Sequence, residues 1–108
     1  DKIVNLNYKI ICFFSTNLDL NKELLKMVYS LNLEPNFKIN IISTGSLKKK
    51  FIKANKIGAD GCIIFGENEW PSNQVVWKDF SSGEQELIDC DRIHQFLKEK
   101  FLKNVIKR

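Results

Sequence analysis

The chain has 108 residues, of which 44% are apolar and 28% are charged, and its formal net charge is +4. This length predicts one domain, and eight Phe with thirteen Ile exclude a disordered chain. No apolar run reaches the roughly 18 residues of a membrane-spanning helix, and the N-terminus lacks a signal-peptide pattern. We therefore expect a cytoplasmic protein without a membrane partner.

The charges are segregated along the chain. Residues 1–56 carry a net +6, residues 57–90 a net −6 and residues 91–108 a net +4. Fifteen Lys, eleven Asn and only two Ala are typical of an AT-rich genome, which weakens the total charge as a sign of nucleic-acid binding. Codon usage explains the segregation less easily, so the segregation is the more informative feature.

Strand and helix patterns alternate over the first 66 residues. An apolar stripe at helical spacing predicts a helix over residues 18–33, and a second helix opens at residues 44–46 and ends at Gly58. Continuous apolar runs predict buried strands at residues 8–15, 37–42 and 61–66. This alternation predicts an α/β sheet with right-handed parallel crossovers.

The pattern then changes. Only seven residues separate the third strand from a strand predicted at residues 74–80, which is too short for a parallel crossover, so the fourth strand should run antiparallel. An acidic edge strand at residues 84–89 follows, and Asp91 is expected to cap a last helix that continues through Val105. The whole chain, residues 1–108, is expected to form one three-layer α/β/α domain.

No arrangement of residues predicts catalysis. The single histidine, His94, lies on the polar side of the last predicted helix, where a lone surface histidine usually has no catalytic role. The glycines form neither GxGxxG nor a P-loop pattern, and three isolated cysteines give no metal-ligand spacing. We expect the cysteines to be buried thiols in a reducing compartment, and the domain to hold no catalytic residue, metal or cofactor.

Anion binding is better supported. Gly45 and Ser46 stand between a strand end and a helix start, where free N–H groups and the helix dipole favour a phosphate. No acid occurs in residues 47–56, whose basic side chains are Lys48, Lys49, Lys50, Lys53 and Lys56. A solvated lysine-rich face explains this segment as well as phosphate contact does.

The loop after the third strand has the opposite character. Glu67 and Glu69 carry carboxylates that accept hydrogen bonds from base amino groups, Asn68 adds an amide, and Trp70 can stack on an unpaired base. In open α/β sheets, ligands bind beyond the carboxyl ends of the strands, where this loop is expected. Alternatively, Trp70 packs down as the anchor of a turn before Pro71.

Five segments occur in a familiar order: GSLKKKF, ANKIGA, FGENE, VVWKDF and SGEQ, from residue 45 to residue 85. In this combination the chain resembles the C-terminal anticodon-binding domain of bacterial-type histidyl-tRNA synthetase, a class IIa aminoacyl-tRNA synthetase. The likeness covers about residues 8–101. The pattern GA…GExE…VKD is shared among class IIa anticodon domains, whereas GSxKKxF together with SGEQ points to the histidine enzyme.

The resemblance implies a five-stranded mixed sheet of order 2-1-3-4-5, with strand 4 antiparallel, and three helices. It also implies a homodimeric parent protein that joins histidine to tRNA(His) with ATP and Mg, of which this domain is a non-catalytic part. Residues 1–7 are then expected to be a linker or tail from a catalytic domain. The expected partners are the tRNA(His) anticodon stem-loop and that catalytic domain, with no DNA.

Carried over residue by residue, the resemblance places Glu67 and Glu69 near anticodon bases. It places four residues near the anticodon-stem backbone: Gly45, Ser46, Lys48 and Lys49. On physical grounds alone we add Lys50 and Lys53 to the backbone contacts. On the same grounds the base contacts gain Asn68, Trp70 and Lys78.

Two alternatives remain open. A free-standing or paralogous anticodon-like module could serve in regulation or dimerisation with the same fold. A small α/β enzyme or nucleotide binder has only the crevice of the sheet in its favour.

Overall fold

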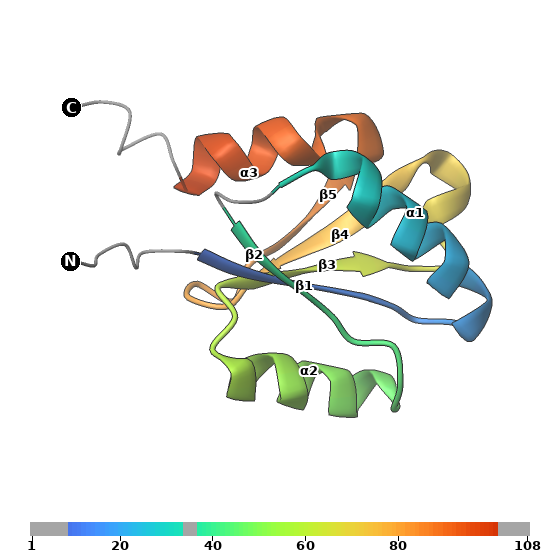
Figure 1. The fold of residues 1–108 in the computed structure, drawn as a ribbon, viewed down its shortest axis with the longest axis horizontal. Helices are drawn as coiled ribbons and strands as arrows, with labels where there is room; N and C mark the ends of the chain where they lie inside the picture. Colours follow the sequence, from blue (N-terminus) through green and yellow to red (C-terminus); the bar gives the residue numbers. More distant parts are fainter. Residues whose placement is uncertain (1–8, 34–36, 102–108) are drawn as a thin grey trace.

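The computed structural model describes residues 9–33 and 37–101. It has a five-stranded sheet of order β2-β1-β3-β4-β5, in which β1 pairs parallel with β2 and β3, and β4 pairs antiparallel with β3 and β5 (Figure 1). The strands are β1 (Lys9–Ser15), β2 (Phe37–Ile41), β3 (Gly61–Phe65), β4 (Gln74–Asp79) and β5 (Gln85–Asp89). The helices are α1 (Asn21–Leu31), α2 (Leu47–Ile57) and α3 (Ile93–Phe101). The expected strand order and the antiparallel β4 are confirmed.

Helices cover the two faces of the sheet unequally. In Figure 1, α1 and α3 lie on one side and α2 alone lies on the other. Successive side chains of β1 point to opposite faces, so Phe13 belongs to the larger core under α1 and α3, and Phe14 to the smaller core under α2. On the α2 side, the outer strands are less covered, and Leu87 of β5 is 55% exposed.

Helix boundaries depart from the predictions in two places. The predicted helix over residues 18–33 begins as a 3-10 turn, Leu18–Leu20, because the Asn17 side chain accepts a hydrogen bond from the Asp19 N–H, and it ends where Asn32 adopts a left-handed φ of 49°. Asp91 does not cap the last helix: it lies inside a 3-10 turn, Cys90–Arg92, and α3 starts at Ile93. The predicted linker at residues 1–7 and Val105 lie outside the described residues.

The three cysteines are buried and free, as expected. Cys12 and Cys62 stand opposite each other on β1 and β3, and the hydrogen bond between their thiols, together with burial, raises the pKa of Cys62. Burial and the nearby charges of Asp91 and Asp89 raise the pKa of Cys90 to about 11. Cys62 and Cys90 are therefore poor candidates for thiolate chemistry. The hydrogen bond with Cys62 lowers the pKa of Cys12, but that thiol is fully buried.

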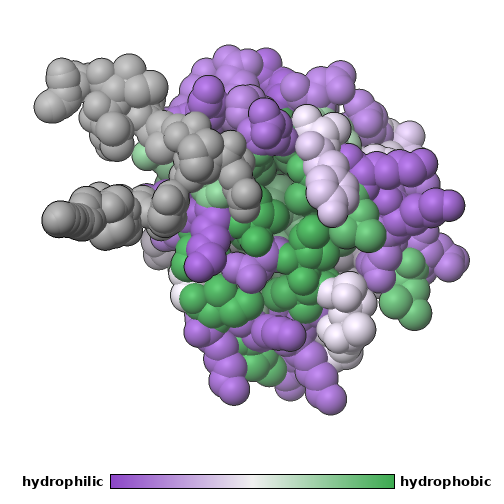
Figure 2. All heavy atoms as spheres, viewed as in Figure 1, coloured by the Kyte–Doolittle hydropathy of each residue, from purple (hydrophilic) through white to green (hydrophobic). Residues whose placement is uncertain are grey.

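Within residues 9–33 and 37–101, no group of three His, Cys, Asp or Glu side chains is placed to hold a metal ion. In the same ranges no helix has the length and apolarity needed to cross a bilayer. Apolar side chains gather in the middle of the face shown in Figure 2, around the edge strand β2. Ile39 and Ile41 of β2 line a hollow of about 280 Å³ there, together with Val28, Tyr29, Asn32 and Leu33.

Close packing at the start of β3 requires a glycine. A Cβ atom added to Gly61 would overlap the indole of Trp77, which is 1% exposed and lies in edge contact with Phe96 and Phe101. The indole is held between the sheet and α3, so it cannot move aside without loosening the larger core.

We therefore expect Gly61→Ala to lower the free energy of unfolding by about 1–3 kcal/mol through overpacking. Urea denaturation followed by circular dichroism measures the change. In a Trp77→Phe background, where the smaller ring leaves room for the methyl group, the same substitution should cost less. An equal cost in both backgrounds would contradict the packing explanation.

Candidate nucleic-acid interface at the carboxyl edge of the sheet

Three loops meet where the parallel strands end, and we call residues 15–17, 43–46 and 66–69 the carboxyl edge. The Thr16 N–H donates to the Phe65 carbonyl at 3.0 Å, and the Glu67 N–H donates to Thr16 Oγ1 at 3.3 Å. Asn21, at the start of α1, donates from Nδ2 to the Ser43 carbonyl at 3.4 Å. The loops after β1, β2 and β3 are therefore joined into one surface.

The first turn of α2 leaves this edge as the predicted anion site. Gly45 has a φ of 102°, which favours glycine, and Ser46 is an extended N-cap whose Oγ accepts from the Lys49 N–H at 3.2 Å. No acid occupies the first turn, where Lys48 and Lys49 are exposed. Cations here oppose the helix dipole, so a bound anion would relieve an unfavourable arrangement.

Four exposed lysines of α2 form what we call the lysine face: Lys48, Lys49, Lys53 and Lys56. Among the described residues, no carboxylate forms an ion pair with any of them, and the one ion pair found there joins Lys100 to Asp79. Their charges are therefore free to attract a polyanion.

Lys50, which was predicted to contact phosphate, does not belong to this exposed face. The side chain is only 5% exposed, and Nζ donates a 2.9 Å hydrogen bond to the carbonyl of Ser15, the last residue of β1. Desolvation lowers the pKa of its ammonium group. The signal was available in the sequence, because Lys50 lies three residues after Leu47 and four before Ala54, both on the predicted buried stripe.

The acidic loop after β3 presents its carboxylates at the same edge. Glu67 and Asn68 are exposed, and Glu67 Oε1 accepts a weak 3.4 Å hydrogen bond from Asn17 Nδ2. The half-buried Glu69 folds back over Gly66, where any Cβ atom would overlap its carboxylate. Gly66 is therefore needed for Glu69 to lie where it does.

Trp70 is the anchor of a turn. It begins a 3-10 turn, Trp70–Ser72, and its ring packs on Phe65 with centroids 4.9 Å apart and planes inclined by 33°. One face of the indole is thus covered by the larger core, as expected if Trp70 packs down as the anchor of a turn before Pro71.

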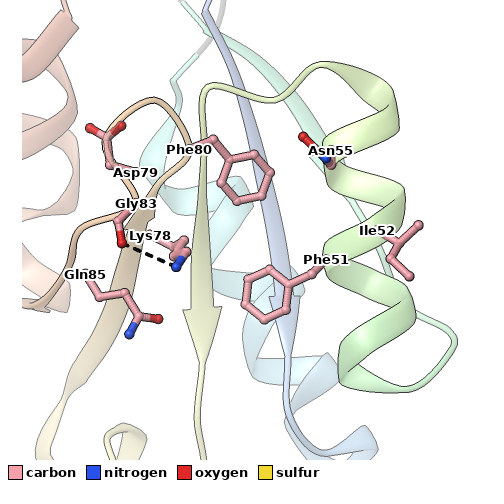
Figure 3. Close-up of a pocket in the computed structure, with 8 residues that line it drawn as sticks. All are labelled: Phe51, Ile52, Asn55, Lys78, Asp79, Phe80, Gly83 and Gln85. Atoms are coloured by element: carbon pink, nitrogen blue, oxygen red, sulfur yellow. Dashed lines mark hydrogen bonds between the residues drawn. The ribbon is translucent and has the colours of Figure 1, made fainter.

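Lys78 lies away from the acidic loop. It stands opposite Cys62, three residues before β3 ends, and Nζ donates to the Gly83 carbonyl at 3.3 Å (Figure 3). It lines a hollow of about 510 Å³ between α2 and the β4–β5 hairpin, together with Phe51, Ile52, Asn55, Asp79, Phe80, Gly83 and Gln85. The predicted base contacts therefore fall in two places, one at the carboxyl edge and one on the open face of the sheet.

The residues after β1 were missed as members of the site. Thr16 holds the backbone of Glu67, and Asn17 contacts its carboxylate. The signal was the polar pair Thr16-Asn17 directly after a buried strand, at the position where ligands bind in open α/β sheets.

The first turn of α2 and the acidic loop thus both lie at the carboxyl edge of the sheet. A family model described as an anticodon binding domain matches residues 7–100. The chain belongs to this family. The domain is also similar to the histidine–tRNA ligase of Acinetobacter baumannii, with 38% identity over 68 residues, which are 63% of this chain and 16% of that protein. The histidine–tRNA ligase of Pelotomaculum thermopropionicum is 40% identical over 55 residues, 51% of this chain and 13% of that one.

Solved structures share the fold of the domain. The apo histidyl-tRNA synthetase of S. aureus superposes with a TM-score of 0.72 and 18% identity, over 88% of this chain and 28% of that one. The histidyl-tRNA synthetase of Nostoc sp. PCC 7120 superposes with a TM-score of 0.74 and 23% identity, over 83% of this chain and 22% of that one. The RNA binding domain of threonyl-tRNA synthetase from Cryptosporidium parvum superposes with a TM-score of 0.74 and 15% identity, over 84% of this chain and 23% of that one. The chain therefore spans only part of its relatives: the 68 matched residues are about a sixth of the ligase from A. baumannii, and the structural matches cover 22–28% of the solved chains.

Ser46 caps α2 through its hydroxyl group, so Ser46→Ala should lower the free energy of unfolding by about 1 kcal/mol. Ser46→Asp retains an acceptor and adds a favourable charge at the helix start, and it is the matched control that should keep the stability. Thermal or urea denaturation measures both. If the two variants lose the same stability, the capping role of Ser46 is contradicted.

Proposed function

We propose that this domain binds the anticodon stem-loop of tRNA(His) as part of a histidine–tRNA ligase. The observation that carries the proposal is the carboxyl edge itself, where a member of the anticodon-binding family joins a lysine face to an acidic loop. Cations suit the phosphates of the stem, whereas carboxylates repel phosphates and accept hydrogen bonds from base edges. One RNA loop offers both kinds of group.

In this proposal the backbone of the stem meets the first turn of α2 and the lysine face. Free N–H groups beside Gly45 and Ser46 donate to one phosphate, and Lys48, Lys49 and Lys53 neutralise others. These contacts supply affinity that does not depend on sequence.

The anticodon bases are read beyond β3. The carboxylates of Glu67 and Glu69 accept from base amino or imino groups, and the amide of Asn68 both donates and accepts. Trp70 offers only the part of its ring that Phe65 leaves uncovered. Lys78 would take part through the hollow on the open face, which is also lined by Phe51, Asn55, Phe80 and Gln85 (Figure 3).

The parent protein would attach histidine to tRNA(His) with ATP and Mg in a catalytic part that corresponds to the remaining length of the relatives. A homodimer in the cytoplasm belongs to the same proposal. The ligase names of the relatives favour it over a regulatory or dimerisation module.

The lysine face is tested by Lys53→Ala. We expect weaker binding of every anticodon stem-loop by a similar factor, and a salt dependence of log K reduced by about one unit of slope, because one phosphate contact is lost. Fluorescence anisotropy at several salt concentrations measures both. Lys98→Ala, an exposed lysine of α3 on the opposite side of the sheet, is the control and should change neither. Equal losses in the two variants would show that the lysine face is not the contact.

Base reading is tested by Glu67→Gln, which retains one acceptor oxygen and removes the charge. We expect the difference in binding free energy between stem-loops with the histidine anticodon and with an altered anticodon to fall by about 1–3 kcal/mol, since a base contact rather than a phosphate contact is lost. Glu84→Gln, an exposed carboxylate in the β4–β5 hairpin, is the matched control. A ratio that Glu67→Gln leaves intact would refute the role of Glu67.

A further inference from the structure

Lys50 is one of three buried polar or charged residues in the described part of the chain, with Ser15 and Asp79. Burying an ammonium group is costly unless its hydrogen bonds are satisfied, and apolar residues fill such a position of a helix at lower cost. Asp79 has Lys100 as an ionic partner, whereas Lys50 has a backbone carbonyl. Its ammonium is therefore retained at a stability cost that packing alone does not explain.

The group that Lys50 holds lies at the centre of the carboxyl edge. Its partner is the carbonyl of Ser15, a fully buried residue whose Oγ lies 2.7 Å from Asn21 Oδ1 and 2.8 Å from the Asn17 carbonyl. Asn21 in turn donates to the Ser43 carbonyl in the loop that leads to α2. Lys50 therefore joins the first turn of α2 to the same strand end that organises the other loops.

The hydrogen bonds of the next residue, Thr16, connect Ser15 to the acidic loop. Thr16 follows Ser15 in the chain, and it both donates to the Phe65 carbonyl and accepts from the Glu67 N–H. A displacement of the Ser15 backbone would therefore move the residue that supports Glu67. On the other side, Lys49 precedes Lys50 on the exposed side of the same helical turn.

We propose that Lys50 is a positioning residue, which holds the lysine face and the acidic loop in a fixed relative register so that one RNA meets both surfaces together. This inference rests on the proposed function. Lys50 itself touches no RNA, because its ammonium is enclosed between α2 and the end of β1. When the lysine face and the acidic loop are held in fixed positions, RNA binds both without the entropic cost of aligning them. The fixed alignment then couples the phosphate contacts to the selection of the anticodon bases.

The test compares Lys50→Met with Lys49→Met in this chain. Both remove one ammonium group from adjacent positions of α2, one buried and one exposed. Lys49→Met should weaken all stem-loops alike and reduce the salt dependence by about one unit of slope. Lys50→Met should keep the wild-type salt dependence and lower the affinity ratio between histidine and altered anticodons by about threefold or more.

Lys50→Gln separates the tether from the charge, because its amide retains an N–H donor without a cation. Lys50→Gln should lower the affinity ratio between histidine and altered anticodons less than Lys50→Met does. If Lys50→Met reduces the salt dependence as Lys49→Met does, Lys50 is a phosphate contact and the inference fails. If the ratio is unchanged at equal folded fraction, Lys50 is only structural and the inference fails as well.

Amide hydrogen exchange tests the same register without RNA. In Lys50→Met, exchange should accelerate at the amides of Thr16 and Glu67, and stay at the wild-type rate at Lys78, whose strand lies away from the edge. Unchanged protection at Thr16 and Glu67 would overturn the positioning role. Wild-type chain that binds every anticodon equally would instead overturn the proposed function, while the exchange result still decides the role of Lys50.

Discussion

The parallel pairing of β1 with both β2 and β3 is the constraint on which the rest of the site depends. β1 is buried toward its carboxyl end, so its register with its neighbours is set by packing on both faces. Because all three strands run the same way, their carboxyl ends stop at one edge of the sheet. The loop that leads into α2 and the acidic loop after β3 are distant in the sequence, and this pairing brings them to the same edge of the sheet.

Polar side chains at that edge turn three loops into one surface. Ser15, Thr16 and Asn21 connect the loops through hydrogen bonds, and Lys50 ties α2 to them from beneath. The buried ammonium costs desolvation, and the cations at the start of α2 oppose its dipole. Unfavourable local choices of this kind are expected at functional sites, where they serve binding rather than stability.

The unequal covering of the sheet has a second consequence. α1 and α3 share one face and hold Trp77 in a dense core, whereas α2 covers only part of the other face (Figure 1). The hollow beside α2 therefore lies next to β4 and exposes the rings of Phe51 and Phe80 to whatever approaches Lys78. This hollow lies toward the opposite end of the strands from the carboxyl edge, because Lys78 and Asp79 pair with Cys62 and Gly61 at the start of β3.

Much of the fold could be predicted from the sequence, because apolar runs, helical stripes and the short connection before β4 are local signals. The antiparallel β4, the start of α2 after residues 44–46 and its end at Gly58 follow from such signals, whereas the strand order was implied by the family resemblance. The site was predicted less completely. Charge, spacing and the family resemblance predicted RNA contacts at Lys49, Lys53 and Glu67, which stay predictions, but a count of lysines does not show which of them points inward. Tertiary structure decided that Lys50 is buried, that Trp70 rests on Phe65 and that Lys78 lies apart from the acidic loop. The physical reason is that sequence specifies which face of an element is apolar, whereas only packing determines which polar groups meet there.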